Sequence, residues 1–282
     1  MTMLGVSLEK DEIGRLAHRA RVNCLRVGHQ AGPQGAHFGP ALSLIEILSV
    51  LYGSVLGVDP SQVGSIDRDR LILSKGHGSL GLYTVLHEYG FISAELLETF
   101  ESEGGVLPGQ PIRNRELGIE FSSGSLGMGL SFGLGLALSA RMSGSQRHVY
   151  VIMGDGETNE GSVWEAAMAA NHFGVTNLTA IIDVNDMQSD GSTMQVLGMD
   201  HARMWAGFGW DVREVADGHD VTQLMAAFAE PAVSGPRVVL ARTVKGKGVS
   251  FMEHSFDWHH GRLSNDQLSG ALGELTTTSE WI

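Results

Sequence analysis

Apolar residues recur along the chain in two spacings, one typical of helices and the other of buried strands. Over 11–29 they return every three or four residues, and Asp11 stands where it can cap the first turn, so we expect a helix there. A second apolar stretch, 42–52, predicts another helix after a turn-rich loop over 28–40. Short runs of apolar and β-branched residues predict strands at 71–73, 149–153, 178–184 and 237–241.

The order of these elements predicts the fold class. The strands alternate with helices, including one over 163–172, and strands that read as continuous apolar runs are buried on both faces. We therefore predict an α/β fold, a parallel sheet with helices on both faces. Residues 1–282 show no internal repeat and no long linker, so we expect a single domain. A C-terminal extension from about residue 260 is expected to hold a loop and one short helix.

Composition narrows the class of protein without naming a function. A chain of 282 residues that is 43% hydrophobic can bury a large core. A net charge of −13 argues against sequence-independent binding to nucleic acid, which needs a basic face. The single cysteine, Cys24, cannot form an intrachain disulfide framework or a cysteine-based zinc site, and we expect it to be buried in the first helix. We find no secretory signal and no apolar run long enough to cross a bilayer, so we expect a cytoplasmic protein that does not bind membranes.

Candidate chemistry follows two neighbouring strands. Gly154-Asp155-Gly156 comes directly after one strand, and Asn185 follows the next strand, 30 residues after Asp155. Because the carboxyl ends of adjacent parallel strands lie side by side, we expect Asp155 and Asn185 to face one small object. Their oxygens suit Mg²⁺ or Ca²⁺, and the glycines and the following helix start suit a diphosphate. Gly-Asp-Gly alone would more often be an ordinary turn; the asparagine at the next strand end favours the metal site.

Five segments in order resemble the transketolase family. Residues 154–191 are similar to the family's thiamine diphosphate motif, most of all to that of the short N-terminal subunits of split bacterial transketolases. The other four matching segments are 73–78, 123–127, 243–248 and 258–260. Because the resemblance covers nearly the whole chain, it implies thiamine diphosphate and Mg²⁺ (or Ca²⁺) as cofactors and a thiamine diphosphate-binding fold.

The resemblance also implies individual site residues. The metal ligands would be Asp155, Asn185 and the main-chain carbonyl of Met187. Glu160 resembles a family carboxylate at a subunit interface, although a glutamate favoured by the dipole at a helix start explains it nearly as well. The implied catalytic residues are His37, His77, His259 and Glu160. The implied cofactor-binding residues are His77, Gly124, Leu126, Gly154, Asp155, Gly156, Asn185, Met187 and His259.

The chain departs from the family in its substrate loops. The family's Gly-His-Pro-Gly loop reads Ala-His-Phe-Gly around His37, although the imidazole remains. Gln110 stands where the family has a histidine that contacts the donor sugar; it can donate a hydrogen bond but cannot carry a positive charge. Met128 replaces the usual glutamine. We expect His37, Gln110 and His259 to contact substrate, and we expect a dedicated or secondary pathway rather than the usual sugar-phosphate pair.

The resemblance implies a partner chain. A complete transketolase is roughly twice this long, and its catalytic glutamate lies in a pyrimidine-binding domain that this sequence does not contain. We therefore expect a C-terminal transketolase-like subunit carrying that domain and glutamate, in an α2β2 heterotetramer. The expected reaction moves a two-carbon ketol unit from a ketose-type donor to an aldehyde acceptor. In it His37, His77 and His259 would orient oxygens and move protons.

Two alternatives stay open. The first is another thiamine-dependent chain, a 2-oxo acid dehydrogenase α subunit or a deoxyxylulose-phosphate synthase fragment; segments 245–248 and 258–259 favour transketolase instead. The second is a non-catalytic subunit that keeps the fold for assembly, which the intact Asp155 and Asn185 oppose. The glycine-rich run 124–135 does not match a dinucleotide fingerprint, since no obvious strand precedes it.

Overall fold

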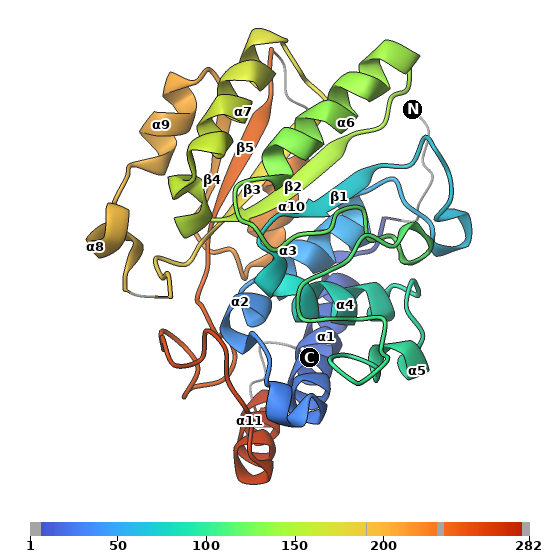
Figure 1. Cartoon of the computed structure of the whole chain (residues 1–282), viewed down its shortest axis with the longest axis vertical. Helices are drawn as coiled ribbons and strands as arrows, with labels where there is room; N and C mark the ends of the chain where they lie inside the picture. Colours follow the sequence, from blue (N-terminus) through green and yellow to red (C-terminus); the bar gives the residue numbers. More distant parts are fainter. Residues whose placement is uncertain (1–6, 190, 230–233, 278–282) are drawn as a thin grey trace.

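The computed structural model describes residues 7–189, 191–229 and 234–277, and it confirms the predicted α/β fold. Within that part of the chain, five parallel strands form one sheet with helices on both faces (Figure 1). In chain order the strands are β1 (Arg70–Leu73), β2 (Val149–Gly154), β3 (Leu178–Val184), β4 (Asp211–Val215) and β5 (Arg237–Arg242). Their order across the sheet is β1-β2-β3-β5-β4, so β5 lies between two strands that precede it in the sequence.

One strand, β4, was missed by the sequence analysis. It pairs only with β5 and forms an edge of the sheet, where most of its residues are half-buried or exposed. Three of its five residues, Asp211, Arg213 and Glu214, are charged, so it lacks the continuous apolar run on which the other strands were recognised.

Helices cover the two faces of the sheet as two separate layers. Side chains that alternate along the strands divide between two apolar clusters: Ile152 and Ile181 belong to one, Val151 and Ile182 to the other. The first layer contains α1 (Lys10–Gln30), α2 (Phe38–Leu42), α3 (Ile45–Val50), α4 (Ser79–Glu88), α10 (Val221–Ala229) and α11 (Asn265–Thr277). The second contains α6 (Gly129–Ser143), α7 (Gly161–His172) and α9 (His201–Gly207). Two short helices, α5 (Ala94–Leu97) and α8 (Thr193–Leu197), lie within loops.

The first two predicted helices form, but their bounds and the predicted cap differ from those in the structure. Helix α1 is one residue longer at each end than predicted, but Asp11 is not its cap: Glu9 is the N-cap residue, its side chain makes no capping hydrogen bond, and Asp11 lies in the first turn. The predicted helix 42–52 is interrupted after α2, resumes as α3, and continues into a π-helical turn over 51–55. Cys24 is buried in α1 as expected, and burial raises the pKa of its thiol to about 12.

The stretch Phe38–Val55 corrects one expectation. Its 18 residues have a mean hydropathy of 1.5, so by length and composition it could cross a membrane, contrary to the prediction that no apolar run is long enough. In the structure 83% of this stretch is buried, because α3 packs against both α1 and α4 in the core. Core packing therefore accounts for its apolar composition.

Part of the predicted organisation lies outside the described residues. Residues 1–6 and 278–282 of the expected single domain, and Asp190 of the cofactor motif, are among those that the structure does not describe. The single-domain assignment therefore stays a prediction. The C-terminal extension contains the 13-residue α11, longer than the short helix expected, and it packs against α1 through the buried Ala271 and Leu275.

Candidate functional site

A cavity of about 530 Å³ opens at the carboxyl ends of β1, β2, β3 and β5. Loops that follow these four strands supply most of its wall, as expected for a ligand site on a parallel sheet. Nine predicted site residues line it: His77, Leu126, Gly154, Asp155, Gly156, Glu160, Asn185, Met187 and His259. Three others, all within the described residues, are outside its lining: His37, Gln110 and Gly124.

Asp155 directly follows β2, and its carboxylate organises the backbone around it. Oδ1 accepts the amide hydrogen of Gly156 (2.8 Å), and Oδ2 accepts hydrogen bonds from the Asp186 amide (2.8 Å) and the Thr193 hydroxyl (3.0 Å). Burial, and then the negative charge of Asp183, raise the pKa of Asp155 to about 6. A cation bound to the Asp155 carboxylate would compensate its unfavourable negative charge. A carboxyl group in such surroundings is typical of a metal ligand.

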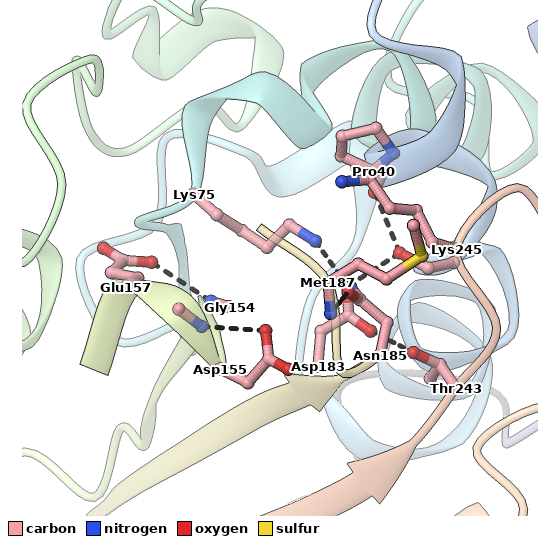
Figure 2. Close-up of polar contacts among 12 residues, drawn as sticks. Pro40, Lys75, Gly154, Asp155, Glu157, Asp183, Asn185, Met187, Thr243 and Lys245 are labelled. Carbon is pink, nitrogen blue, oxygen red and sulfur yellow. Dashed lines mark hydrogen bonds and ion pairs between the residues drawn. The ribbon is translucent and has the colours of Figure 1, made fainter. Parts of the chain in front are cut away.

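The orientation of Asn185 is fixed by Asp183, two residues earlier in the same strand and loop. Asn185 Nδ2 donates to Asp183 Oδ2 (3.1 Å), and its Oδ1 accepts the amide hydrogen of Met187 (3.1 Å). Since the amide nitrogen faces a carboxylate, the side-chain oxygen is the atom left to act as a ligand. The structure therefore presents oxygens of Asp155 and Asn185 at adjacent strand ends of one cavity (Figure 2).

A buried ion pair joins the loop after β1 to the end of β3, beside Asp155 and Asn185. The Lys75 ammonium bonds to Asp183 Oδ2, and the Asp183 carboxylate also accepts hydrogen bonds from the Ser43 and Thr243 hydroxyls. Burial alone would raise the pKa of Asp183, but the Lys75 charge and these hydrogen bonds hold it below its usual value. Figure 2 shows Lys75, Asn185 and Thr243 converging on Asp183.

Lys245 is a second lysine of the cavity, and its direct contacts are with neutral groups. Its ammonium lies 2.9 Å from His259 Nδ1 and 3.4 Å from the Gln188 carbonyl oxygen. Burial, and then the charge of Lys75, lower its pKa to about 8. Because an ammonium donates, His259 Nδ1 accepts, and the proton of the His259 ring is on Nε2.

Three predicted histidines come together although they are far apart in sequence. The ring centroids of His37, His77 and His259 are 5.3–6.0 Å apart, and His260 stacks edge-on against His37 at 4.5 Å. Two backbone hydrogen bonds between Ala36 and Gly261, of 2.8 and 2.9 Å, hold the two loops in place. Burial followed by nearby positive charge lowers the pKa of His37 and of His259 to about 4 and lowers that of His77 well below 6.5. At neutral pH these imidazoles are therefore uncharged.

Glu157, to which the sequence analysis gave no role, joins three loops of the site. Its buried carboxylate accepts hydrogen bonds from the Gly127 amide (2.8 Å), the Gly154 amide (3.2 Å) and the Ser74 hydroxyl. Gly127 has a φ of +79°, and an added Cβ would lie 2.6 Å from Glu160 Cβ, so only glycine fits there. The segment that carries Leu126 is thus held against the end of β2.

Glu160, Gln110 and Met128, which the sequence analysis also named, lie in different surroundings. Glu160 is exposed at the N-cap of α7 and makes no side-chain capping hydrogen bond. Gln110 lies beside Gly76 and Ser123, and its Oε1 has no hydrogen-bond partner among the described residues. Met128 is 47% exposed at the start of α6.

Four charged residues of the site were missed: Lys75, Glu157, Asp183 and Lys245. Each lies in a segment that the sequence analysis quoted, and all four are at most 3% exposed. A charged residue at the end of an apolar strand is the signal that could have found Asp183, since burial of a charge requires a partner. Its partner, 108 positions away, could not be read from spacing.

Known proteins match this chain along most of its length. The family described as "Transketolase, thiamine diphosphate binding domain" matches residues 16–276. An apulose-4-phosphate transketolase subunit of Actinobacillus succinogenes is 40% identical over 271 residues, which cover 95% of this chain and 98% of that protein. A 6-deoxy-6-sulfo-D-fructose transketolase subunit of a Clostridium species is 38% identical, with 92% and 96% covered.

Solved structures of longer transketolase chains contain the fold of this chain. A Pichia stipitis transketolase in complex with sedoheptulose-7-phosphate superimposes with a TM-score of 0.84 at 27% identity, covering 95% of this chain. This chain spans only 40% of the length of that transketolase.

Proposed function

The chain belongs to the transketolase family, and from this premise we propose that it is the diphosphate-binding subunit of a two-chain, thiamine-dependent transketolase. The proposed reaction transfers a two-carbon ketol unit from a ketose-type donor to an aldehyde acceptor. The observation that supports it best is the joint placement of Asp155, Asn185 and Lys245 on one cavity at the strand ends. Among thiamine-dependent classes, the family match favours transketolase over a 2-oxo acid dehydrogenase subunit.

The cavity has the features that a diphosphate and its metal need. Two buried polar atoms in its wall, Asn159 Oδ1 and Gln188 Nε2, have no hydrogen-bond partner among the described residues. Lys245 supplies a positive charge whose direct contacts are neutral, so the charge is available to an anion. Asp155 and Asn185 offer oxygen ligands of the kind that Mg²⁺ takes when phosphates complete its coordination.

We propose Asp155, Asn185 and the Met187 carbonyl as the metal site, with Mg²⁺ (or Ca²⁺) as the ion. The three hydrogen bonds that Asp155 accepts leave part of its lone-pair capacity for a cation. The Gly156 amide is engaged by Asp155 in this structure, so the expected backbone contact of Gly156 with diphosphate stays a prediction. No group of three or more His, Cys, Asp or Glu side chains among the described residues forms a different metal site.

Thiamine diphosphate, when bound, supplies the electron sink that lets a carbon–carbon bond beside a carbonyl break. The protein's own contribution follows from its protonation states. Since His37 and His259 have pKa values of about 4, they are weak bases that donate hydrogen bonds to sugar oxygens better than they abstract protons. Lys245 keeps the ring proton of His259 on Nε2, where it can be donated.

A partner subunit is the second part of the proposal. Relatives of nearly the same length are named as transketolase subunits. The short helix α8 carries exposed apolar side chains at the rim of the cavity: Met194 is 71% exposed, Val196 47% and Leu197 57%. An apolar rim around an open cofactor site is suited to a covering protein. We propose that this protein is a C-terminal transketolase-like subunit carrying the pyrimidine-binding domain and catalytic glutamate, in an α2β2 heterotetramer in the cytoplasm.

We further propose a substrate pair that differs from that of the general transketolases. Gln110 replaces the family histidine that contacts the donor, and two relatives are named for apulose-4-phosphate and 6-deoxy-6-sulfo-D-fructose. Fast turnover of xylulose and ribose phosphates by the assembled enzyme would contradict this part.

Calorimetric titration of thiamine diphosphate with Mg²⁺ tests the proposal, first into this chain and then into its complex with the candidate partner. We expect tight binding in the complex, loss of binding in Asp155→Ala, and no loss in Glu165→Ala, which removes an exposed carboxylate on α7 outside the cavity lining. Transfer of a ketol unit is then measured by mass spectrometry of the products. A wild-type complex that binds no cofactor would overturn the proposal and favour a non-catalytic assembly subunit.

A further inference from the structure

A buried polar network connects the helix layer to the loop that carries Lys245. Arg21 on α1 and Glu46 on α3 are both 0% exposed and form an ion pair, and His219, 9% exposed in the loop before α10, bonds to the same carboxylate. His219 Nδ1 lies 2.7 Å from Glu46 Oε2. Burial alone would raise the pKa of Glu46, but Arg21 and the His219 hydrogen bond hold it at about 2, so Glu46 is charged.

Both ends of this network reach the backbone of the Lys245 loop. His219 Nε2 accepts the amide hydrogen of Val244 (2.8 Å), and Arg21 donates to the carbonyl oxygen of Lys247. These two backbone groups flank Lys245 on either side. Because an amide can only donate, the ring proton of His219 is on Nδ1, where it is donated to Glu46.

Other segments also hold this loop: the Gly246 amide donates to the Gly39 carbonyl oxygen (3.1 Å), and the Lys245 carbonyl oxygen accepts the His254 amide hydrogen (3.1 Å). Gly246 and Gly248 have φ values of +82° and +91°. Glycine adopts such conformations readily, but it can also leave them at little cost, so these residues alone do not fix the loop. An added Cβ at Gly248 would lie 2.8 Å from Arg21 Cδ, so the loop lies directly on the arginine. Hydrogen bonds from several segments, those of His219 and Arg21 among them, therefore determine where Lys245 is held.

We propose that His219, supported by Glu46 and Arg21, is a positioning residue that places the Lys245 ammonium for the cofactor diphosphate. A buried ion pair adds little net stability compared with apolar side chains of similar size, so conformational definition is the better account of this one. The inference rests on the proposed function, because Lys245 has to bind diphosphate for its position to matter. It is the bond to Val244, rather than the bond to Glu46, that acts on Lys245.

Two substitutions at position 219 separate these bonds. His219→Asn keeps a donor near the place of Nδ1 and loses the acceptor for Val244, whereas His219→Gln keeps an acceptor near the place of Nε2. We expect H219N to weaken thiamine diphosphate binding by the assembled complex about 10-fold, as other supporting residues of ligand sites do. H219Q should recover most of that affinity. His148→Asn is the matched control, a half-buried histidine bonded to Thr179 (2.8 Å) at the opposite end of the sheet, and it should leave the affinity unchanged.

A double-mutant cycle with Lys245→Met decides whether His219 acts through Lys245. If it does, H219N costs affinity when Lys245 is present and almost none in the K245M background. Equal losses in both backgrounds would overturn the inference and leave His219 a purely structural residue, while the proposed function would stand.

Hydrogen exchange gives a readout that does not need the cofactor. In H219N the Val244 amide should exchange faster while the amides of β2 keep their protection. If the wild-type complex bound no thiamine diphosphate, the proposed function would fail, and unchanged Val244 protection in H219N would independently overturn the positioning role.

Discussion

The Lys75 ammonium and the Asp183 carboxylate are paired with 1% and 0% of their side chains exposed, and they join the loop after β1 to the end of β3. Removing one partner of an ion pair this deeply buried destabilises the fold, because the remaining charge is desolvated without compensation. The pair therefore makes the floor of the cavity sensitive to single substitutions.

Asp183→Asn should lower the free energy of unfolding by about 3–5 kcal/mol, because it leaves the Lys75 charge buried and unpaired. Denaturant unfolding at pH 7 measures this. The double variant K75M/D183N removes both charges and should be more stable than D183N. An unfolding midpoint of D183N equal to that of the wild type would show that the pair does not exist in solution.

Lys245 should give cofactor binding a distinctive alkaline limit. Its pKa of about 8 in the free chain means that the ammonium is lost as the pH rises above 8. Affinity for thiamine diphosphate should then fall by up to about tenfold per pH unit, since binding requires uptake of that proton. Calorimetry between pH 7 and 9.5 measures the slope in the complex.

The K245M variant is the control for this pH dependence. It should bind more weakly at pH 7 and show no added loss between pH 8 and 9. A wild-type profile parallel to that of K245M would mean that Lys245 does not contact the diphosphate.

His37 and His259 should destabilise the chain in acid. Their pKa values of about 4 in the folded chain lie below the usual 6.5, so between pH 6.5 and 4 the unfolded chain binds more protons. The free energy of unfolding should therefore fall as the pH drops through that window. Denaturant unfolding of wild type and of H37N/H259N at pH 7 and 4.5 measures it, and the double variant should lose less stability. Equal losses would mean that the two imidazoles titrate normally.

Gly127→Ala should be destabilising by at least about 1 kcal/mol, because its φ of +79° and the 2.6 Å approach to Glu160 exclude a Cβ. The matched control is Gly135→Ala in the exposed interior of α6, where an added Cβ meets nothing within 4 Å. That substitution should stabilise the chain by about 0.5–1 kcal/mol. Thermal unfolding compares the two, and a stable G127A would show that the Leu126 segment can move away from α7.

The extent to which the sequence predicted the fold depended on burial. The four strands buried on both faces were found because continuous apolar runs identify them, whereas three of the five residues of the edge strand β4 are charged. The break between α2 and α3 was not predicted, because 38–55 is mostly apolar and 83% buried, and periodicity cannot place a turn inside such a stretch.

The site was predictable where chain topology fixes it. Asp155 and Asn185 end adjacent parallel strands, so their meeting follows from one crossover. The pairing of Lys75 with Asp183, and the support of Lys245 by His219, depend on how distant loops pack, and sequence spacing carries no such information. The structure places nine of the predicted residues on one cavity, but the roles assigned to all of the predicted site residues stay predictions.

The position of β5 has a consequence for how the chain folds as it leaves the ribosome. β4 is synthesised before β5, yet its only neighbour in the sheet is β5. A nascent chain that ends after residue 229 therefore has three strands in place and a fourth with no ladder to join. The edge of β3 stays open until residues 237–242 emerge, so a translational pause between the two strands would expose an aggregation-prone edge that the finished subunit covers.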